Sequence, residues 1–296
     1  MPMSARMTYT ANMSFRYIDA HGHLQFPEFD ADREELIARM REEEIGGLVV
    51  GTDLDSSKRA VELVEEHENL YAAIGLHPTD SDEAFDASAY RALTASPKVV
   101  AIGECGLDYF RNAALDDAEK QRQKELFKQH IALAAELDKP LIIHARPSSA
   151  KVTEGKPSYD AYHDVLDLLK EAKQKYPNLR GDSHFFAGGV AEAEAFVALG
   201  FTVSFTAVIT FARDYDEVIR AVPLTSILAE TDAPYVAPAS RRGKRNDPLA
   251  VVEVVAKIAE IRGEDPETVR LALLANTCRL FRLSGGPLVA GGKNPC

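Results

Sequence analysis

The sequence is poor in cysteine and has no long hydrophobic run. Its three cysteines, Cys105, Cys278 and Cys296, are odd in number and widely spaced, which excludes a disulfide framework and a zinc ribbon and favours a reducing compartment. No stretch is apolar for long enough to form a secretory signal or a membrane span. We therefore expect a cytoplasmic protein that contacts no membrane, with one domain at 16–283 between tails at 1–15 and 284–296.

Positive charge is also scarce, because 34 Lys and Arg residues face 46 Asp and Glu residues, for a formal net charge of −12. Such a surface repels polyanions, which argues against a protein that wraps duplex nucleic acid, so any phosphate site must be local. Sequence repeats and low-complexity tracts are absent. A Gly-x-Gly-x-x-Gly motif is missing after the first expected strand, which disfavours a dinucleotide-binding fold.

Short apolar segments that favour β-structure recur along the chain and alternate with helix-period segments. The expected strands are Tyr17–Ala20, Ile45–Val50, Tyr71–Leu76, Val99–Gly103, Pro140–His144, Leu179–His184, Phe201–Phe205 and Ser226–Glu230. The expected helices include Arg33–Glu44, Ser56–Glu66, Glu119–Leu137, Tyr162–Tyr176, Val190–Leu199 and Pro248–Ile261. This alternation predicts right-handed βαβ units and a parallel sheet.

Eight such units are the number at which a parallel sheet closes into a (β/α)8 TIM barrel, which is the fold we predict. A doubly wound open sheet is the alternative. Barrel active sites form at the carboxyl ends of the strands. The segment 147–159, rich in Pro, Ser, Gly and Lys, follows the fifth strand and predicts an enlarged loop on that face.

Polar side chains gather at these strand ends. The group contains four of the eight histidines of the chain and two carboxylates: His21, His23, Glu104, His144, His184 and Asp232. Imidazole and carboxylate bind divalent first-row metals, and the lack of thiolates excludes a structural cysteine site. Six ligands exceed the three usual for one catalytic zinc, so we expect two divalent ions, Mg²⁺, Mn²⁺ or Zn²⁺, roughly 3.5–4 Å apart.

Individual roles follow from position. Glu104 lies between the two histidine sets in chain order and is the candidate for a catalytic bridging ligand, while Asp232 is the candidate general base that takes a proton from the attacking water. Side chains that alternate along the first strand would put Asp19 on the face of His21 and His23, where it can hold the second nitrogen of a histidine. His77 precedes a proline and is either a ligand or a substrate-binding residue. A structural role is expected for His67, His130 and His163.

The charge of the site indicates its substrate. Two divalent ions with two carboxylates leave about +2 at the mouth of an acidic protein, which would attract a phosphodiester or a carboxylate. Arg146 follows the fifth strand, and a basic run follows Asp232. Its members Arg242, Lys244 and Arg245 are candidates for phosphate binding, although such a run is also typical of a solvated loop.

These residues together resemble the TatD family of metal-dependent deoxyribonucleases, a branch of the amidohydrolase-like barrels. The matching motifs run through almost the whole chain: DAHGHL at 19–24, IGLHP at 74–78, AIGECGLDYF at 101–110, PLIIHAR at 140–146, HFFAGG at 184–189, ETDAPYVAP at 230–238, RGKRNDP at 242–248 and NTCRLF at 276–281. The resemblance implies the same six metal ligands, a bridging Glu104, and hydrolysis of DNA, often as a 3′–5′ exonuclease with magnesium or manganese.

This chain departs from the family pattern at Thr79, where a second histidine is usual, at Phe185, where cysteine is frequent, and at Ala207, where glycine is common. None of these is an expected ligand. We therefore expect a two-metal phosphodiesterase that acts on DNA, on single strands or strand ends, and we favour a monomer.

Two other functions stay open. One is a small-molecule amidohydrolase or lactonase, but such enzymes frequently carry a carbamylated lysine on the fourth strand, where this chain has Glu104. The other is a catalytically silent metal-binding protein, against which the complete ligand set argues.

Overall fold

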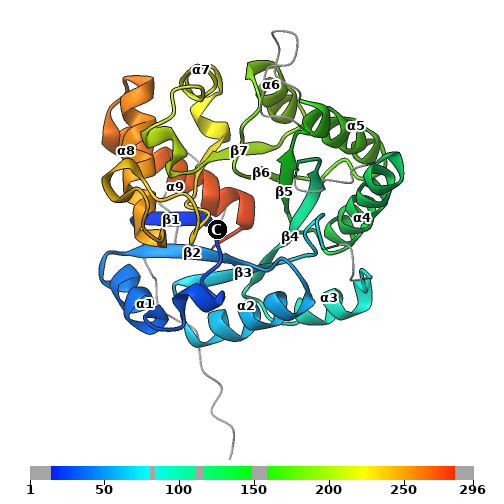
Figure 1. Cartoon of the computed structure of the whole chain (residues 1–296), viewed down its shortest axis with the longest axis horizontal. Helices are drawn as coiled ribbons and strands as arrows, with labels where there is room; N and C mark the ends of the chain where they lie inside the picture. Colours follow the sequence, from blue (N-terminus) through cyan, green and yellow to red (C-terminus); the bar gives the residue numbers. More distant parts are fainter. Residues whose placement is uncertain (1–14, 81–83, 111–115, 149–158, 284–296) are drawn as a thin grey trace, which may run out of the picture.

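A computed structural model describes residues 15–80, 84–110, 116–148 and 159–283 (Figure 1). The strands are β1 (Tyr17–Gly22), β2 (Ile45–Val50), β3 (Leu70–Ile74), β4 (Val99–Asp108), β5 (Leu141–Arg146), β6 (Gly181–Ser183), β7 (Thr202–Phe205) and β8 (Ile227–Ala229). Each strand pairs in parallel with the next, in the order β1 to β8. The predicted (β/α)8 barrel is confirmed. Residues 1–14 of the tail expected at 1–15, the tail expected at 284–296, and most of the loop expected at 147–159 lie outside the described residues.

Helices surround the ring of strands (Figure 1). They are α1 (Arg33–Glu42), α2 (Leu54–Glu66), α3 (Ala87–Leu93), α4 (Asp117–Glu136), α5 (Asp160–Lys175), α6 (Val190–Ala198), α7 (Asp216–Ala221), α8 (Val251–Arg262) and α9 (Pro266–Phe281). Aspartates fix where several begin. The Asp53 carboxylate accepts a bond from the Ser56 amide before α2, and Asp116 caps α4 in the same way. Among the described residues, no helix is long and apolar enough to cross a membrane.

The barrel closes between its last and first strands just beyond β8. The amide of Asp232 donates to the carbonyl of His21 at 2.9 Å, and the amide of His23 donates to the carbonyl of Ala233 at 2.7 Å. A parallel bridge joins Gly22 to Ala233. Closure therefore places Asp232 directly beside the two histidines that end β1.

Two hydrophobic cores hold the barrel. One lies between the strands and the surrounding helices, and the other fills the inside of the barrel. The inner core uses small strand residues such as Ala73 and Ala101, and it is completed by Phe15 and by side chains of α9, including Leu274 and Phe281. The alternating pattern does not predict α9. This helix closes the barrel away from the carboxyl ends of the strands and leaves that end for the site.

β4 differs in length from the prediction. It was expected to end at Gly103 but runs to Asp108, so that Glu104 lies within the strand. The ladder to β5 shifts between Ile102 and Cys105 and then continues from Gly106 to Asp108. The longer strand carries a second carboxylate, that of Asp108, to the same end of the barrel.

Candidate metal centre

The closure of the barrel assembles a first set of donors. Nε2 of His21 lies 3.3 Å from Nε2 of His23 and 3.4 Å from Oε2 of Glu104. Oδ1 of Asp232 lies 3.4 Å from Nε2 of His23 and 3.8 Å from Nε2 of His21. Four atoms from three strand ends thus converge on one point.

The second set uses the other oxygen of the same carboxylate. Oε1 of Glu104 lies 2.9 Å from Nδ1 of His144 and 2.9 Å from Nε2 of His184. These two nitrogens are 3.4 Å apart. Nε2 of His77 approaches the same oxygen to 3.5 Å. Glu104 therefore stands between two groups of imidazoles and offers one oxygen to each.

Both sets fit a divalent cation. Donors about 2.1 Å from an ion lie about 3.0 Å from each other in octahedral geometry and about 3.4 Å in tetrahedral geometry. The separations within the two sets run from 2.9 Å to 3.9 Å. The donors are imidazoles and carboxylates, which are the types that such ions accept, and all are buried except His144, which is partly exposed. The six residues expected to bind metal are thus brought together.

Neighbouring groups hold the imidazoles in place from behind. Nδ1 of His23 lies 2.7 Å from the carbonyl oxygen of Val50, and Nε2 of His144 lies 3.0 Å from Oδ2 of Asp108. Nδ1 of His184 is 3.6 Å from Oε1 of Glu230. Such partners fix the ring orientation and the tautomer of a ligating histidine.

Sequence reasoning assigned no role to Asp108 or Glu230. A signal for Asp108 was present, because it lies four residues after Glu104, on the same face of an extended strand. This signal was missed because the strand was expected to end at Gly103, before Asp108. Glu230 was noted only as part of a strand end, and its carboxylate also accepts bonds from the Phe185 amide and the Ser204 hydroxyl.

The role expected for Asp19 is wrong in one respect. Its carboxylate does not hold an imidazole nitrogen but accepts bonds from the Thr231 amide at 2.8 Å and the Thr231 hydroxyl at 2.6 Å, with a longer one from the His21 amide at 3.3 Å. The β1 ladder is irregular between Asp19 and Gly22, which breaks the alternation on which the expectation rested. Asp19 instead ties β1 to the segment after β8.

The electrostatics of the centre keep its carboxylates ionised. Burial alone would raise the pKa of Glu104, but the facing histidines outweigh it and hold this pKa well below its usual value. Burial would likewise raise the pKa of Asp232, but the neighbouring imidazoles outweigh burial and lower it. Burial would lower the pKa of His184, yet Glu104 and Glu230 raise it well above normal. Ionised carboxylates are what a cation requires.

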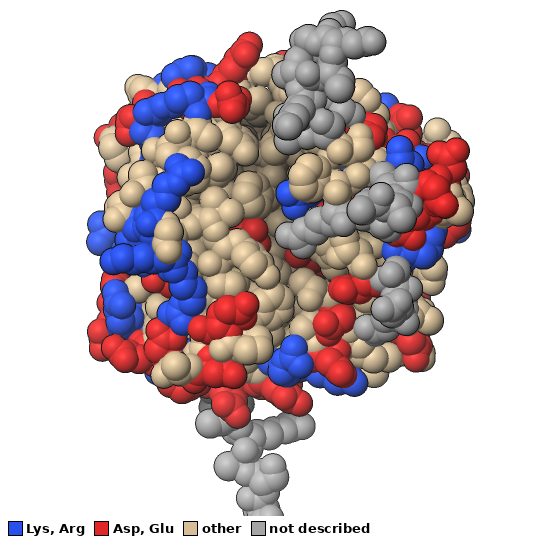
Figure 2. All heavy atoms as spheres, viewed as in Figure 1, with Lys and Arg blue, Asp and Glu red and all other residues tan. Residues whose placement is uncertain are grey.

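A cavity of about 550 Å³ opens above the two donor sets. Figure 2 shows the hollow at the centre of this face, with acidic atoms at its bottom. Its walls include Phe26, Thr79, Arg146, Phe185 and Tyr235. The predicted Arg146 thus borders the cavity, as does His77, whose Nδ1 is 2.7 Å from the Thr79 hydroxyl.

The basic residues that follow β8 differ in whether they are paired with a carboxylate. Arg245 binds Asp32 through two nitrogens, at 2.8 Å and 2.6 Å, and so pins the loop to the start of α1. Arg242 lies over the ring of Phe211, and Lys244 is exposed. In the described part of the chain, no carboxylate lies within 4 Å of the charged nitrogens of Arg242 or Lys244. Figure 2 shows Lys and Arg in a band beside the hollow, over the segments around α8.

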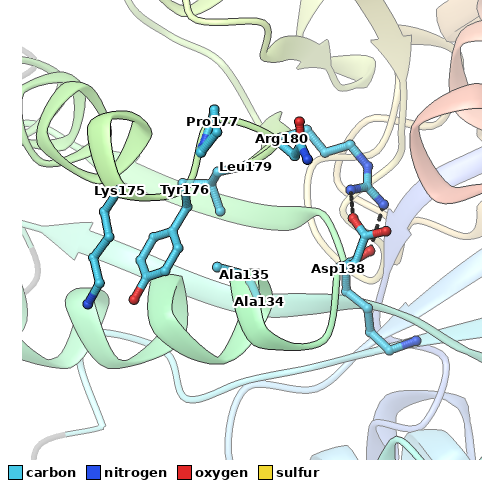
Figure 3. Close-up of a pocket in the computed structure, with 10 residues that line it drawn as sticks. Ala134, Ala135, Asp138, Lys175, Tyr176, Pro177, Leu179 and Arg180 are labelled. Carbon is cyan, nitrogen blue, oxygen red and sulfur yellow. Dashed lines mark hydrogen bonds and ion pairs between the residues drawn. The ribbon is translucent and has the colours of Figure 1, made fainter.

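A smaller depression, of about 210 Å³, lies near the amino ends of β5 and β6 (Figure 3). Arg180 binds Asp138 there at 2.7 Å, and Lys139 donates to the carbonyl of Val99. These charges already have partners. In TIM barrels this end serves stability, while the site lies at the other end.

Comparison with known proteins agrees with this geometry. The family described as TatD related DNase matches residues 18–282. The chain belongs to the TatD family. It is a metal-dependent hydrolase of this family, and the predicted resemblance is confirmed.

Three TatD relatives illustrate the match. The uncharacterized metal-dependent hydrolase YabD of Bacillus subtilis (strain 168) is 38% identical over 271 residues, which cover 90% of this chain and 99% of that protein. The 3′-5′ ssDNA/RNA exonuclease TatD of Cronobacter sakazakii is 33% identical, covering 88% and 95%. The crystal structure of the TatD homologue YjjV of Escherichia coli K12 matches with a TM-score of 0.78 at 33% identity, covering 90% and 98%.

Proposed function

We propose that this protein hydrolyses phosphodiester bonds at the 3′ ends of single-stranded DNA, as a 3′–5′ exonuclease that uses two divalent cations. The observation that carries the proposal is the position of Glu104, which offers Oε2 to the histidines of β1 and Oε1 to His144 and His184. The relative named as a 3′-5′ ssDNA/RNA exonuclease supports the choice of substrate.

The donors divide between two cations as the geometry suggests. His21, His23 and Asp232 would hold one, His144 and His184 the other, and Glu104 both. When bound, such cations activate water as a nucleophile and neutralise charge on the phosphoryl oxygens.

Asp232 is the residue that accepts the proton of the attacking water. Its carboxylate is buried at the bottom of the cavity, and its lowered pKa means that it carries no proton before the reaction. Arg146, on the cavity wall, binds a phosphate oxygen of the substrate and keeps it over Glu104. His77 approaches Oε1 of Glu104 from the same cavity and lies where it can contact the same phosphate.

The shape of the site favours a strand end. A cavity of about 550 Å³ has the size of a small-molecule site, which suits a terminal nucleotide better than an intact duplex. The net charge of −12 disfavours a broad electrostatic surface for duplex DNA, and the band of Lys and Arg beside the hollow supplies positive charge locally.

The test is hydrolysis of a 5′-labelled single-stranded oligonucleotide with Mg²⁺, Mn²⁺ or Zn²⁺. We expect stepwise shortening from the 3′ end, slower hydrolysis of a blunt duplex, and a loss of at least about 100-fold for Glu104→Ala. Leu271→Ala, on the surface of α9, is the matched control. Unchanged turnover by Glu104→Ala would refute the site, and hydrolysis of lactones or amides without any hydrolysis of oligonucleotides would favour the small-molecule alternative.

A further inference from the structure

Two of the most exposed aromatic side chains of this protein stand at the mouth of the barrel. Among the described residues, the exposed large hydrophobic side chains are Phe110 (48%), Tyr235 (45%) and Leu271 (38%). Tyr235 follows β8 and borders the cavity, and Phe110 follows β4. Tyr235 lines the cavity itself, and Phe110 contacts Arg146 of the cavity wall. Large aromatic rings left exposed at this end of the barrel are available to stack on a ligand.

The two rings lie on opposite rims. In a closed ring of eight strands in sequential order, β4 is across the barrel from β8. Glu104, on β4, and Asp232, after β8, meet at the bottom between them. A chain that spans the mouth from Tyr235 to Phe110 therefore passes over the two donor sets.

Each ring has a neighbour that restrains it. The guanidinium of Arg146 lies over Phe110 at 4.3 Å from the ring centroid. Tyr235 meets the ring of His23 edge to face, with centroids 6.2 Å apart, and Phe26 stacks on His23 at 4.6 Å. Both rims thus combine an aromatic ring with a group that contacts the site itself.

Exposed aromatic rings beside positive charge are the features by which proteins bind unpaired nucleic acid bases. Arg146 provides the charge on one rim. On the other, Arg242 lies over Phe211 at 4.0 Å and Lys244 is exposed, both in the segment that follows Tyr235. These cations would contact the phosphates of the same strand.

We propose that Tyr235 and Phe110 are base-stacking residues, which hold the two nucleotides on either side of the cleaved phosphodiester of a single strand. This inference rests on the proposed function, since stacking on both rims stretches the intervening phosphate over Glu104. It also supplies a reason for selectivity, because the faces of paired bases inside a duplex are covered by their neighbours. Single strands and frayed ends are then bound, and a blunt duplex must open first.

The test uses the fluorescence of 2-aminopurine, which stacking on an aromatic ring quenches. The chain contains no tryptophan, so the probe can be excited with little protein background. Single-stranded oligonucleotides carry the probe at the 3′-terminal position, at the penultimate position or far from the end, with phosphorothioate linkages that resist cleavage. We expect quenching at the first two positions and little change at the third.

Variants separate the two rings. We expect Tyr235→Ala and Phe110→Ala each to abolish quenching at one of the two positions and to weaken binding by about 5- to 150-fold. Tyr235→Phe retains a ring and Leu271→Ala lies on α9, so both should match the wild type. An abasic residue in place of the stacked base should make wild type and the alanine variant bind alike.

The outcomes distinguish the two proposals. Cleavage by the wild type together with identical quenching and affinity in all variants would overturn base stacking and leave the proposed function intact. Quenching that both alanine variants lose, in a protein that cleaves no oligonucleotide with any of the three metals, would reject the proposed function and keep the binding role of the rings. A wild type that neither quenches nor cleaves would overturn both.

Discussion

Oδ2 of Asp108 lies 3.0 Å from Nε2 of His144, on the side of the imidazole opposite Glu104. The other ring nitrogen, Nδ1, points at Glu104. With a cation bound at Nδ1, the imidazole would keep its proton on Nε2 and donate it to Asp108. The candidate metal centre therefore includes Asp108, which contacts an expected donor and not the cation itself.

Removing the charge of Asp108 should weaken metal binding. In the wild type, Oδ1 of Asp108 accepts a hydrogen bond from the backbone amide of Phe110. Asp108→Asn keeps an oxygen for this bond, but the side-chain amide of the new asparagine holds the His144 ring less firmly than a carboxylate does. We expect the dissociation constant of the metal to rise about 10- to 100-fold, measured by titration calorimetry. Asp164→Asn is the matched control, because Asp164 accepts a bond from the Tyr109 hydroxyl outside the donor sets. Equal losses in both variants would contradict this role.

Metal should also stabilise the fold. Five of the six expected donors are buried. A cation that binds only the folded protein adds about 2.7 kcal/mol of stability at a hundred times its dissociation constant. After treatment with a chelator, restoring the metal should raise the melting temperature by several degrees in a thermal unfolding assay. Glu104→Ala, which lacks the shared ligand, should show a much smaller rise. A full rise in that variant would place the cation elsewhere.

His130 should make the stability depend on pH. Its Nε2 accepts a bond from the Leu76 amide and its Nδ1 lies 2.9 Å from the Leu126 carbonyl, in full burial. Burial lowers the pKa of His130 from 6.5 to about 4. Between pH 4 and pH 6.5, the unfolded chain therefore binds a proton on His130 that the folded protein does not. The contribution of neutral His130 to the free energy of unfolding is complete above pH 6.5 and is lost as the pH falls towards 4.

The measurement is urea unfolding across this pH range, with a chelator present. We expect His130 to account for about 3 kcal/mol of the decline in unfolding free energy, and His130→Gln to flatten the profile by that amount. Leu271→Ala, which changes no titratable group, should leave the profile unchanged. An identical decline in wild type and His130→Gln would show that other groups cause it.

The helix α9 should matter for stability and not for chemistry. Phe281 is 3% exposed and completes the inner core at the end of the barrel away from the site. Phe281→Ala should lower the unfolding free energy by about 3–5 kcal/mol, while the turnover of the folded enzyme stays unchanged. Leu271→Ala, on the exposed face of the same helix, should change it by less than about 0.5 kcal/mol. A loss of turnover in folded Phe281→Ala would link α9 to the site.

The sequence predicted the barrel and its donors because both depend on local patterns. Alternating strand and helix periods set the number of βα units, and polar residues at strand ends identified the set that includes Glu104 and Asp232. Asp108 was missed because the length of β4 depends on its pairing with β5. The error at Asp19 has a similar origin, since the ladder between β1 and β2 is irregular from Asp19 to Gly22 and the carboxylate binds Thr231 beyond β8.

The order of the elements and the gathering of six expected donors at strand ends could be predicted from the sequence itself, because side-chain periodicity and strand-end positions are properties of short segments. Only the tertiary structure decided that Glu104 faces two histidine sets at once, that Arg245 is tied to Asp32, and that Tyr235 and Phe110 stand on opposite rims. These relationships join residues far apart in the chain, and the physical reason is that distance and direction between such groups are fixed only when the barrel closes and packs.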